Sequence, residues 1–131
     1  MQFSVAVRNA RLDAIESTIG ASAILEIRSG SAPANCAAAD SGTVLATLAL
    51  PADWMAAAAS GSKAKSGTWE DTSADATGTA AHFRIKDNGG STCHIQGTVS
   101  TSGADLNVDN TSFAAGQPFT ITGFTITDGN A

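Results

Sequence analysis

The sequence predicts a mainly-β domain, an antiparallel β-sandwich of jelly-roll-like type with one helix near its N-terminus. Short segments of alternating apolar and polar residues recur along the chain with turn-forming residues between them, which is typical of sandwiches. The clearest is Phe119–Thr127, where threonines alternate with apolar residues at the two-residue period of a half-buried strand. Because the chain has 131 residues and shows no linker, we expect a single domain over 1–131 with a modest core.

The predicted helix spans residues 5–19. Ser4 is a good N-cap and Gly20 is a good C-terminal stop, so the sequence marks both ends of the segment. The apolar residues of the segment fall near one stripe and its charged residues lie elsewhere. The stripe consists of Val5, Leu12, Ile15 and Ile19. We expect it to pack against an edge or an open face of the sheet, and the alternative is that it docks on a neighbouring subunit.

Two strands are expected after the helix, at Ala23–Arg28 and Thr43–Leu50. The alanine-rich stretch between them, residues 35–41, is interpreted as a loop or a single helical turn. The second strand has apolar side chains on both of its faces. This pattern favours a central strand, or a strand that the helix covers.

Residues 52–80 carry the weakest signals. For residues 52–59 a strand is favoured over a helix, because a Ser-Gly-Ser sequence follows too soon for a stable helix. The tract 63–80 is interpreted as a mobile loop or as one that a partner orders. Trp69 in this tract either closes the core or is an exposed contact with a partner.

Residues 81–99 contain the clearest hairpin signal, with a predicted three-residue loop at Asn88–Gly90. The inward positions of that register are Phe83, Ile85, Cys93 and Ile95. The outward positions, which we expect to be solvated, are His82, Arg84, His94 and Gln96. Cys93 is therefore interpreted as a buried free thiol.

The C-terminal part of the sequence predicts a short strand at Leu106–Val108 and a bent terminal strand. Alternation in the terminal segment shifts phase at Gly123, between the pair ending at Ile121 and the pair beginning at Phe124. A glycine at such a shift indicates a β-bulge or a corner between packed sheets.

Composition excludes several classes of function. Charged residues make up 15 % of the chain, below the roughly 25 % of average soluble proteins, and the net charge is −5. Contact with nucleic acid is disfavoured because it needs clustered Lys and Arg. No window approaches the length of a membrane span, and the start lacks the pattern of a secretory leader. We therefore expect synthesis and folding in a cytoplasm, with no membrane contact.

The sequence predicts no enzyme activity, no cofactor and no metal site. His82 and His94 have no partner at metal-ligand spacing, and no serine lies in a nucleophile elbow. Cys36 and Cys93 are the only cysteines, and their spacing does not show whether they pair.

Five segments spread over nearly the whole chain carry a resemblance: Val7–Ile15, Ile19–Ala23, Leu25–Arg28, Ser102–Asn107 and Phe124–Thr127. These segments resemble small proteins encoded among the virion genes of tailed bacteriophages. The resembling segments contain no catalytic motif. By analogy with compact β-sandwich phage proteins, the resemblance implies a capsid decoration (cement) protein, which binds the outside of the shell and bridges neighbouring capsomers.

The resemblance also implies partners and a location. The partners would be the major capsid protein and further copies of this chain, as a dimer or trimer. The location would be the capsid exterior of the virion, after assembly in the host cytoplasm. We expect the interface to involve Leu12, Ile15, Ile19, Trp54 and Trp69. The alternative function is a tail- or fibre-associated structural or receptor-binding module.

Overall fold

The computed structural model describes residues 1–129, and in this range the chain is mainly β with one helix, as the sequence predicts. The elements are α1 (Val5–Ile19), β1 (Ile24–Ser29), β2 (Val44–Ala49), β3 (Ser62–Ala64), β4 (Trp69–Asp71), β5 (Gly78–Lys86), β6 (Cys93–Ser100), β7 (Leu106–Asn107), β8 (Ser112–Phe113), β9 (Phe119–Ile121) and β10 (Thr125–Thr127). None of the described residues forms a helix that is both long enough and apolar enough to cross a bilayer.

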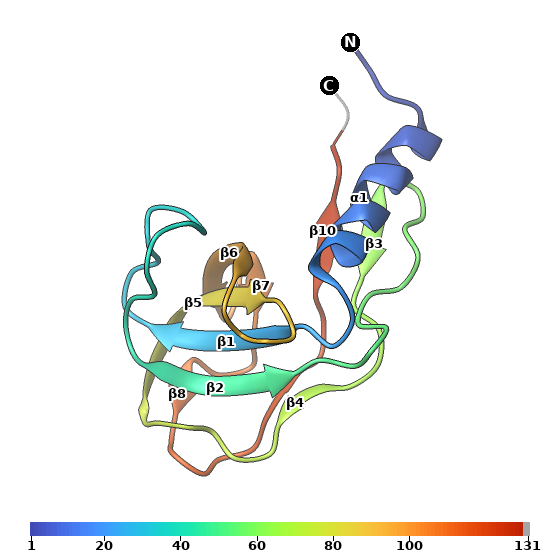
Figure 1. The fold of residues 1–131 in the computed structure, drawn as a ribbon. Coiled ribbons are helices and arrows are strands. Elements are labelled where there is room, and N and C mark those ends of the chain that lie inside the picture. The colour runs from blue at the N-terminus through green and yellow to red at the C-terminus, as the bar shows by residue number, and fades with distance from the viewer. Residues whose placement is uncertain (130–131) are drawn as a thin grey trace.

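Six of the described strands form a main sheet in the order β2-β1-β5-β6-β7, with β8 paired to the start of β5 (Figure 1). The strand pairs β3–β10 and β4–β9 form two smaller sheets. All pairings among the described strands are antiparallel except the short parallel pairing of β6 with β7. The strands are thus divided unevenly, unlike the eight strands of a regular double-sheet jelly roll.

The ends of α1 are the ones that the sequence predicts. The Ser4 side chain accepts a hydrogen bond from the backbone N–H of Val7 at 3.3 Å, which satisfies one of the free donors of the first turn. Gly20 has φ +94°, and its N–H donates to the Glu16 carbonyl at 2.8 Å. A positive φ is favourable for glycine and ends the helix before β1 begins.

The core lies on the inner face of the main sheet. Cross-strand register places Leu25 of β1 between Leu48 of β2 and Ile85 of β5, and all three side chains are buried. Aromatic rings from the segments opposite complete the core: the centroid of Phe124 lies 5.5 Å from that of Trp69 and 5.8 Å from that of Phe83. Rings at such separations attract each other beyond the burial of their area.

The terminal segment turns a corner at Gly123, as the phase shift predicts. Before this residue β9 pairs with β4, and after it β10 pairs with β3 in a different sheet. Ile121 and Phe124, on either side of the corner, are both buried, while the threonines of the segment are exposed. The corner therefore keeps apolar residues inward while the chain passes from one sheet to another.

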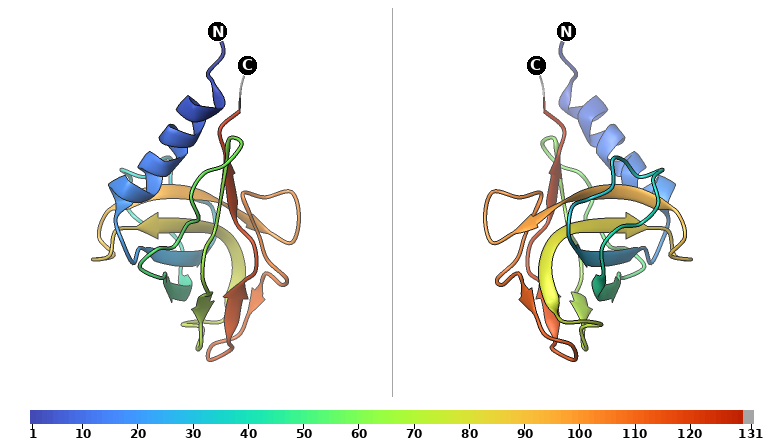
Figure 2. Two further views of the ribbon diagram at one scale, coloured as in Figure 1. Left: turned by 90° about the vertical axis from the view of Figure 1, so that its right-hand side faces the viewer. Right: turned by 90° about the vertical axis from the view of Figure 1, so that its left-hand side faces the viewer.

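The helix α1 and the strands β3 and β10 rise together from the body of the molecule (Figure 2). We call this projection, with the connection 55–61 that precedes β3, the arm. The N-terminus lies at its far end (Figures 1 and 2). The helix was expected to pack against an edge or an open face of the sheet, and it lies instead along β3 of the small β3–β10 sheet.

Two expectations about strands and loops are wrong. β2 is an edge strand of the main sheet, not a central one. It carries apolar residues on both faces because the segment after β4 covers it: the N–H of Asp75 donates to the Leu45 carbonyl at 2.8 Å, and Asp71 accepts from the N–H of Thr47 at 2.9 Å. The tract 63–80 is thus an ordered part of the fold that contains β3 and β4.

Residues 52–59 form no helix, in agreement with the sequence, but they make only isolated bridges. Met55 pairs with Lys65 and Ala59 pairs with Ser62. The predicted strand is therefore absent, and only the prediction that no helix forms in this segment is confirmed.

The hairpin register differs from the predicted one. The N–H of Asp87 donates to the Thr92 carbonyl at 3.1 Å, so the loop holds four residues instead of three. The extra residue turns Cys93 to the outer face, opposite Lys86, and a bulge then restores Ile95 to its place opposite Ile85. A shift of one residue reverses the face of a side chain, which explains why Cys93 lies outside the apolar core.

Candidate functional site

Within the arm, polar contacts hold α1 against β3 and the connection that precedes it. Lys63 of β3 is buried, and its Nζ lies 2.7 Å from Asp13 Oδ1 and 3.2 Å from Glu16 Oε2. The hydrogen bond from Lys63 lowers the pKa of Asp13. Burial alone would lower the pKa of Lys63, but the bonds to the two carboxylates outweigh it and the pKa is raised. Asp13 and Lys63 are therefore both charged at neutral pH.

Helix side chains also satisfy backbone N–H groups of the neighbouring hairpin. Asp13 accepts from the N–H of Ala58 at 2.9 Å, and Asn9 accepts from the N–H of Gly61 at 2.9 Å. On the other side of the helix, Arg11 pairs with Asp128 at 3.2 Å. These directional bonds fix the angle at which the helix leaves the body, because apolar contacts alone would let it slide.

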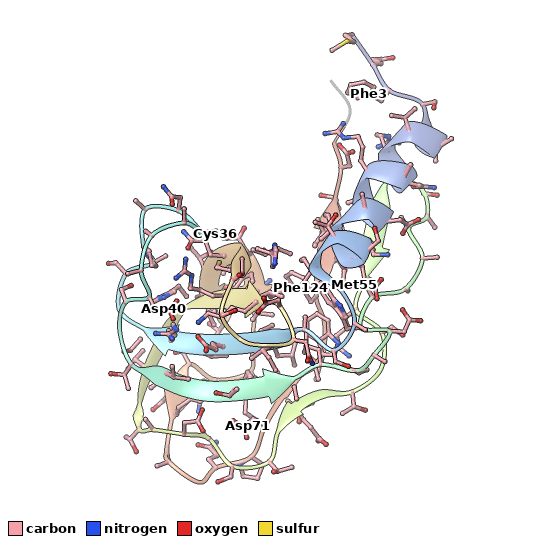
Figure 3. All side chains as sticks on the ribbon, viewed as in Figure 1. Phe3, Cys36, Asp40, Met55, Asp71 and Phe124 are labelled. Atoms are coloured by element: carbon pink, nitrogen blue, oxygen red, sulfur yellow. The ribbon has the colours of Figure 1, made fainter. Side chains whose placement is uncertain are left out.

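The far end of the arm is apolar. The large hydrophobic residues that are exposed among residues 1–129 all fall in the first seven positions: Met1 (99 %), Phe3 (39 %), Val5 (48 %) and Val7 (43 %). We call these four residues the apolar tip. Phe3, near the end of the arm in Figure 3, lies against the Arg11 guanidinium, whose Cζ is 5.0 Å from the ring centroid.

A groove runs beside the helix where α1, β6 and β10 meet. It consists of adjoining hollows of about 420, 470 and 230 Å³ that share Ile15. Ile95 and Ile126 line it from β6 and β10, and both are half-buried. His94 lies at one end of the groove and Asp105 at another. The arm therefore carries a second, concave apolar surface below the tip.

The outer face of the main sheet is covered, although the sequence predicts a solvated face. Residues 30–42, here called the covering loop, cross it, and His82 and Arg84 beneath them are buried. His82 Nδ1 is 2.8 Å from the Gly30 carbonyl oxygen. Arg84 donates to the carbonyls of Asn35, Cys36 and Ala38 at 3.2, 2.9 and 3.1 Å. The Arg84 side chain thus binds three backbone carbonyl groups of the covering loop.

Five ionisable side chains form a charged cluster under this loop: Glu26, Arg28, Asp40, Arg84 and Lys86. Asp40 is central, because it accepts from Lys86 at 2.6 Å, from Arg28 at 3.0 Å and also from Arg84. The hydrogen bond from Lys86 is the largest of the effects that lower the pKa of Asp40. The cluster has one positive charge in excess, and it ties the loop to the sheet.

The two cysteines meet at the edge of the charged cluster. Cys36 of the covering loop and Cys93 at the start of β6 have their Sγ atoms 2.7 Å apart, and both residues are half-buried. Figure 3 places Cys36 close to Asp40, above the main sheet. A hollow of about 340 Å³ lined by both cysteines, Arg84 and Lys86 opens beside them. The interpretation of Cys93 as a free thiol is therefore confirmed, but its expected burial in the core is wrong, because the side chain is half-buried on the outer face.

The predicted interface residues are mostly internal. Leu12, Ile19, Trp54 and Trp69 are buried within this chain, and Ile15 is half-buried. Leu12, Ile15 and Ile19 line the hollows beside the helix. Trp54 Nε1 donates to the Gly20 carbonyl at 2.9 Å, and the Trp69 ring lies within the aromatic core. Both tryptophan side chains are fully buried, so they expose no surface to a neighbouring subunit in this conformation. The interpretation of Trp69 as a residue that closes the core is confirmed.

The sequence did not single out the apolar tip or the charged cluster. Phe3 and Val7 lie outside the predicted stripe or at its margin, and their exposure depends on how far the arm projects. A signal for the cluster was present in the alternation of β5, where basic residues occupy every outward position from 82 to 86.

No three His, Cys, Asp or Glu side chains of residues 1–129 come together in a way that could hold a metal ion. The loop carboxylates instead bind backbone and hydroxyl groups: Asp75 accepts from Thr47 Oγ1 at 2.7 Å and Asp105 from Thr98 Oγ1 at 3.0 Å.

Comparison of the chain with protein-family profiles, with curated proteins and with solved structures found no match.

Proposed function

We propose that this protein is a structural component of a tailed-phage virion, a decoration protein that binds the outer surface of the capsid shell and bridges neighbouring capsomers. The resemblance of its sequence to small phage virion proteins suggests this class. In the structure, the observation that carries the proposal is the apolar tip at the end of the projecting arm.

The position of the tip suits adhesion to a large partner. Exposed apolar residues scattered over a surface need no explanation, but every exposed large hydrophobic residue among residues 1–129 falls in the first seven positions, at one end of the molecule. A 15-residue helix is about 22 Å long, so the arm carries the tip well clear of the body. The polar bonds from Lys63 and Asp128 hold the helix at one angle. A rigid arm of this kind loses little conformational entropy on binding.

Charge also distinguishes the arm from the body. The first eleven residues contain two charged side chains, Arg8 and Arg11, while the whole chain has a net charge of −5. The tip therefore fits an apolar depression with carboxylates at its rim, whereas the acidic body is repelled by packaged nucleic acid. The proposed partner is the major capsid protein, and the proposed site is the capsid exterior.

The alternative of a receptor-binding tail or fibre module receives less support. A glycan-binding version of it would use exposed aromatic rings as stacking platforms. Both tryptophans, at positions 54 and 69, are fully buried, so they cannot serve in that way.

The experiment is a binding assay on undecorated capsids of the phage. Purified protein should sediment with the capsids to a saturating stoichiometry and raise the temperature at which they are disrupted. The double variant Val5→Ser/Val7→Ser removes apolar surface from the tip, and serine and valine have similar helix propensities. We expect the variant to bind at least tenfold more weakly.

The matched control is Ala10→Ser, an exposed position on the same helix outside the tip, which should bind like the natural chain. Cryo-electron microscopy of the particles then shows whether the protein sits on the shell or on the tail. Absence of binding at saturating concentration overturns the proposal, and binding to the tail alone supports the alternative. Sedimentation equilibrium tests the proposed dimer or trimer separately.

A further inference from the structure

The two sulfur atoms at the edge of the charged cluster are in direct contact. Cys36 and Cys93 are 57 residues apart in the sequence, and their Sγ atoms are separated by 2.7 Å. The sulfurs of a disulfide are about 2.05 Å apart, so a relative movement of about 0.7 Å would bring these two to bonding distance. No disulfide is present among the described residues, and both thiols are free in this structure.

Both the sheet and the covering loop position the two cysteines for this contact. On the sheet side, the bulge between Ile85 and Lys86 turns Cys93 to the outer face. On the loop side, Arg84 donates a hydrogen bond of 2.9 Å to the carbonyl of Cys36 itself. Gln96 Nε2 also donates to the Pro33 carbonyl at 2.7 Å, which holds the start of the loop. These bonds hold the covering loop where Sγ of Cys36 meets Sγ of Cys93.

We propose that Cys36 and Cys93 are a site of intramolecular disulfide formation, which covalently joins the covering loop to β6 when the protein meets a small-molecule disulfide such as oxidised glutathione. This inference goes beyond the proposed function and does not depend on it.

The reaction is a pair of thiol–disulfide exchanges. The Cys36 thiolate attacks one sulfur of oxidised glutathione, forms a mixed disulfide and releases one glutathione thiolate. The Cys93 thiolate then attacks Sγ of Cys36 and releases the second glutathione thiolate. Two protein thiols lose two protons and two electrons, and one molecule of oxidised glutathione gains the electrons and becomes two thiols.

The order of attack follows from the surroundings of the two sulfurs. Burial, followed by the hydrogen bond that the Cys93 thiol donates to Cys36, raises the pKa of the Cys93 thiol to about 11, although the Arg84 guanidinium opposes this rise. Cys93 is therefore a poor first nucleophile at neutral pH. Its attack is intramolecular in the second step, where contact with Cys36 gives it a very high effective concentration. The hollow of about 340 Å³ beside the pair gives the oxidant access.

The bond would stabilise the folded chain. It closes a loop across 57 positions, and a cross-link of that span restricts the unfolded chain strongly. For a protein of this size we expect the melting temperature to rise by on the order of 10 °C. In a reducing cytoplasm the thiols would stay reduced, and the bond would form once the protein is outside the cell.

The experiment uses the full chain, purified under reducing conditions and then equilibrated in glutathione buffers of increasing oxidised fraction. The expected result is the loss of both free thiols, a mass decrease of two hydrogens, and a peptide that links Cys36 to Cys93 after proteolysis. On a denaturing, non-reducing gel the oxidised protein should migrate as a single chain, with no disulfide-linked dimer. The melting temperature of the oxidised form should exceed that of the same sample after reduction.

Cys36→Ser and Cys93→Ser are the matched variants. Each should take up one glutathione or none, and neither should show a melting temperature that depends on the oxidant. Because the oxidised and reduced forms of the natural chain are compared directly, the test does not require that the variants fold. Retention of both thiols in fully oxidising buffer overturns the proposal, as does a product that carries only glutathione adducts or intermolecular cross-links.

Discussion

Replacement of Phe124 by alanine tests whether the aromatic core holds the base of the arm. Phe124 lies just after the corner at Gly123, near the lower end of the helix in Figure 3, and its side chain is 7 % exposed. It contacts the rings of Trp69 and Phe83. Truncation of a buried phenylalanine costs about 3–5 kcal/mol, and the loss of two ring contacts places this site in the upper half of that range. We expect a loss of about 4 kcal/mol in the free energy of unfolding.

The assay is equilibrium unfolding in urea under reducing conditions, followed by tryptophan emission. Trp54 and Trp69 are both buried near the site, and their ring centroids are 6.1 Å apart, so the signal reports directly on this part of the core. A slope against urea equal to that of the natural chain shows that the two unfold in the same way. A loss of 4 kcal/mol would remove a large part of the 5–15 kcal/mol that is usual for a domain.

Phe119→Ala is the matched control. Phe119 is only half-buried, on the other side of the corner, and its ring lies 4.7 Å from that of Phe113. We expect a loss of about 2 kcal/mol there, since less apolar area leaves the interior. An equal or smaller loss for Phe124→Ala than for this control would refute the view that the Phe124 contacts organise the base of the arm.

Three further variants test the arm and the covering loop. Lys63→Met removes the buried cation that holds the helix, and hydrogen exchange of α1 amides should become at least tenfold faster, whereas Lys65→Met should leave it unchanged. The hydrogen bond from Lys86 holds the pKa of Asp40 below the ordinary value of an aspartate, so the contribution of Asp40 to stability is present above the ordinary value and is lost as the pH falls through the lowered one. In acid titrations of unfolding, Asp40→Asn should weaken this loss and reduce stability at neutral pH. Gly42→Ala and Gly103→Ala both place an alanine at a positive φ, +70° and +69°, which costs about 1–2 kcal/mol of stability in each variant. At position 42 the added Cβ would also overlap the carbonyl oxygen of Ser29 in β1, whereas at position 103 it meets nothing. The Gly42 variant should therefore have the lower melting temperature.

Local signals sufficed for several elements of the fold. The ends of the helix follow from Ser4 and Gly20, because each makes its contacts within one turn of its own position. The corner at Gly123 follows from a phase shift that is visible in nine residues of sequence. In each case the physical cause acts over a short distance along the chain, so a single sequence contains it.

The covering loop could not be predicted in this way. Its position depends on hydrogen bonds between Arg84 and the carbonyls of residues 35–38, which are more than forty positions away. Without the loop, the alternation of β5 indicates a solvated basic face, which is the interpretation that the structure overturns. The meeting of Cys36 with Cys93 depends on the same loop and on a hairpin that is one residue longer than predicted.

The distribution of basic residues limits where the protein can adhere. The seven Lys and Arg residues all lie in the described part of the chain, and four of them are buried: Arg28, Lys63, Arg84 and Lys86. These four residues form ion pairs with carboxylates of the same chain, so the exposed surface of the body carries more acidic than basic side chains. Acidic bodies repel one another, which opposes contact between them. Exposed apolar and basic groups coincide at the arm, where Phe3 meets Arg11. If the adhesive surface were instead on the body, the Val5→Ser/Val7→Ser variant should bind undecorated capsids as tightly as the natural chain at every salt concentration. We expect the variant to bind more weakly than the natural chain at every salt concentration, as measured by sedimentation with the capsids.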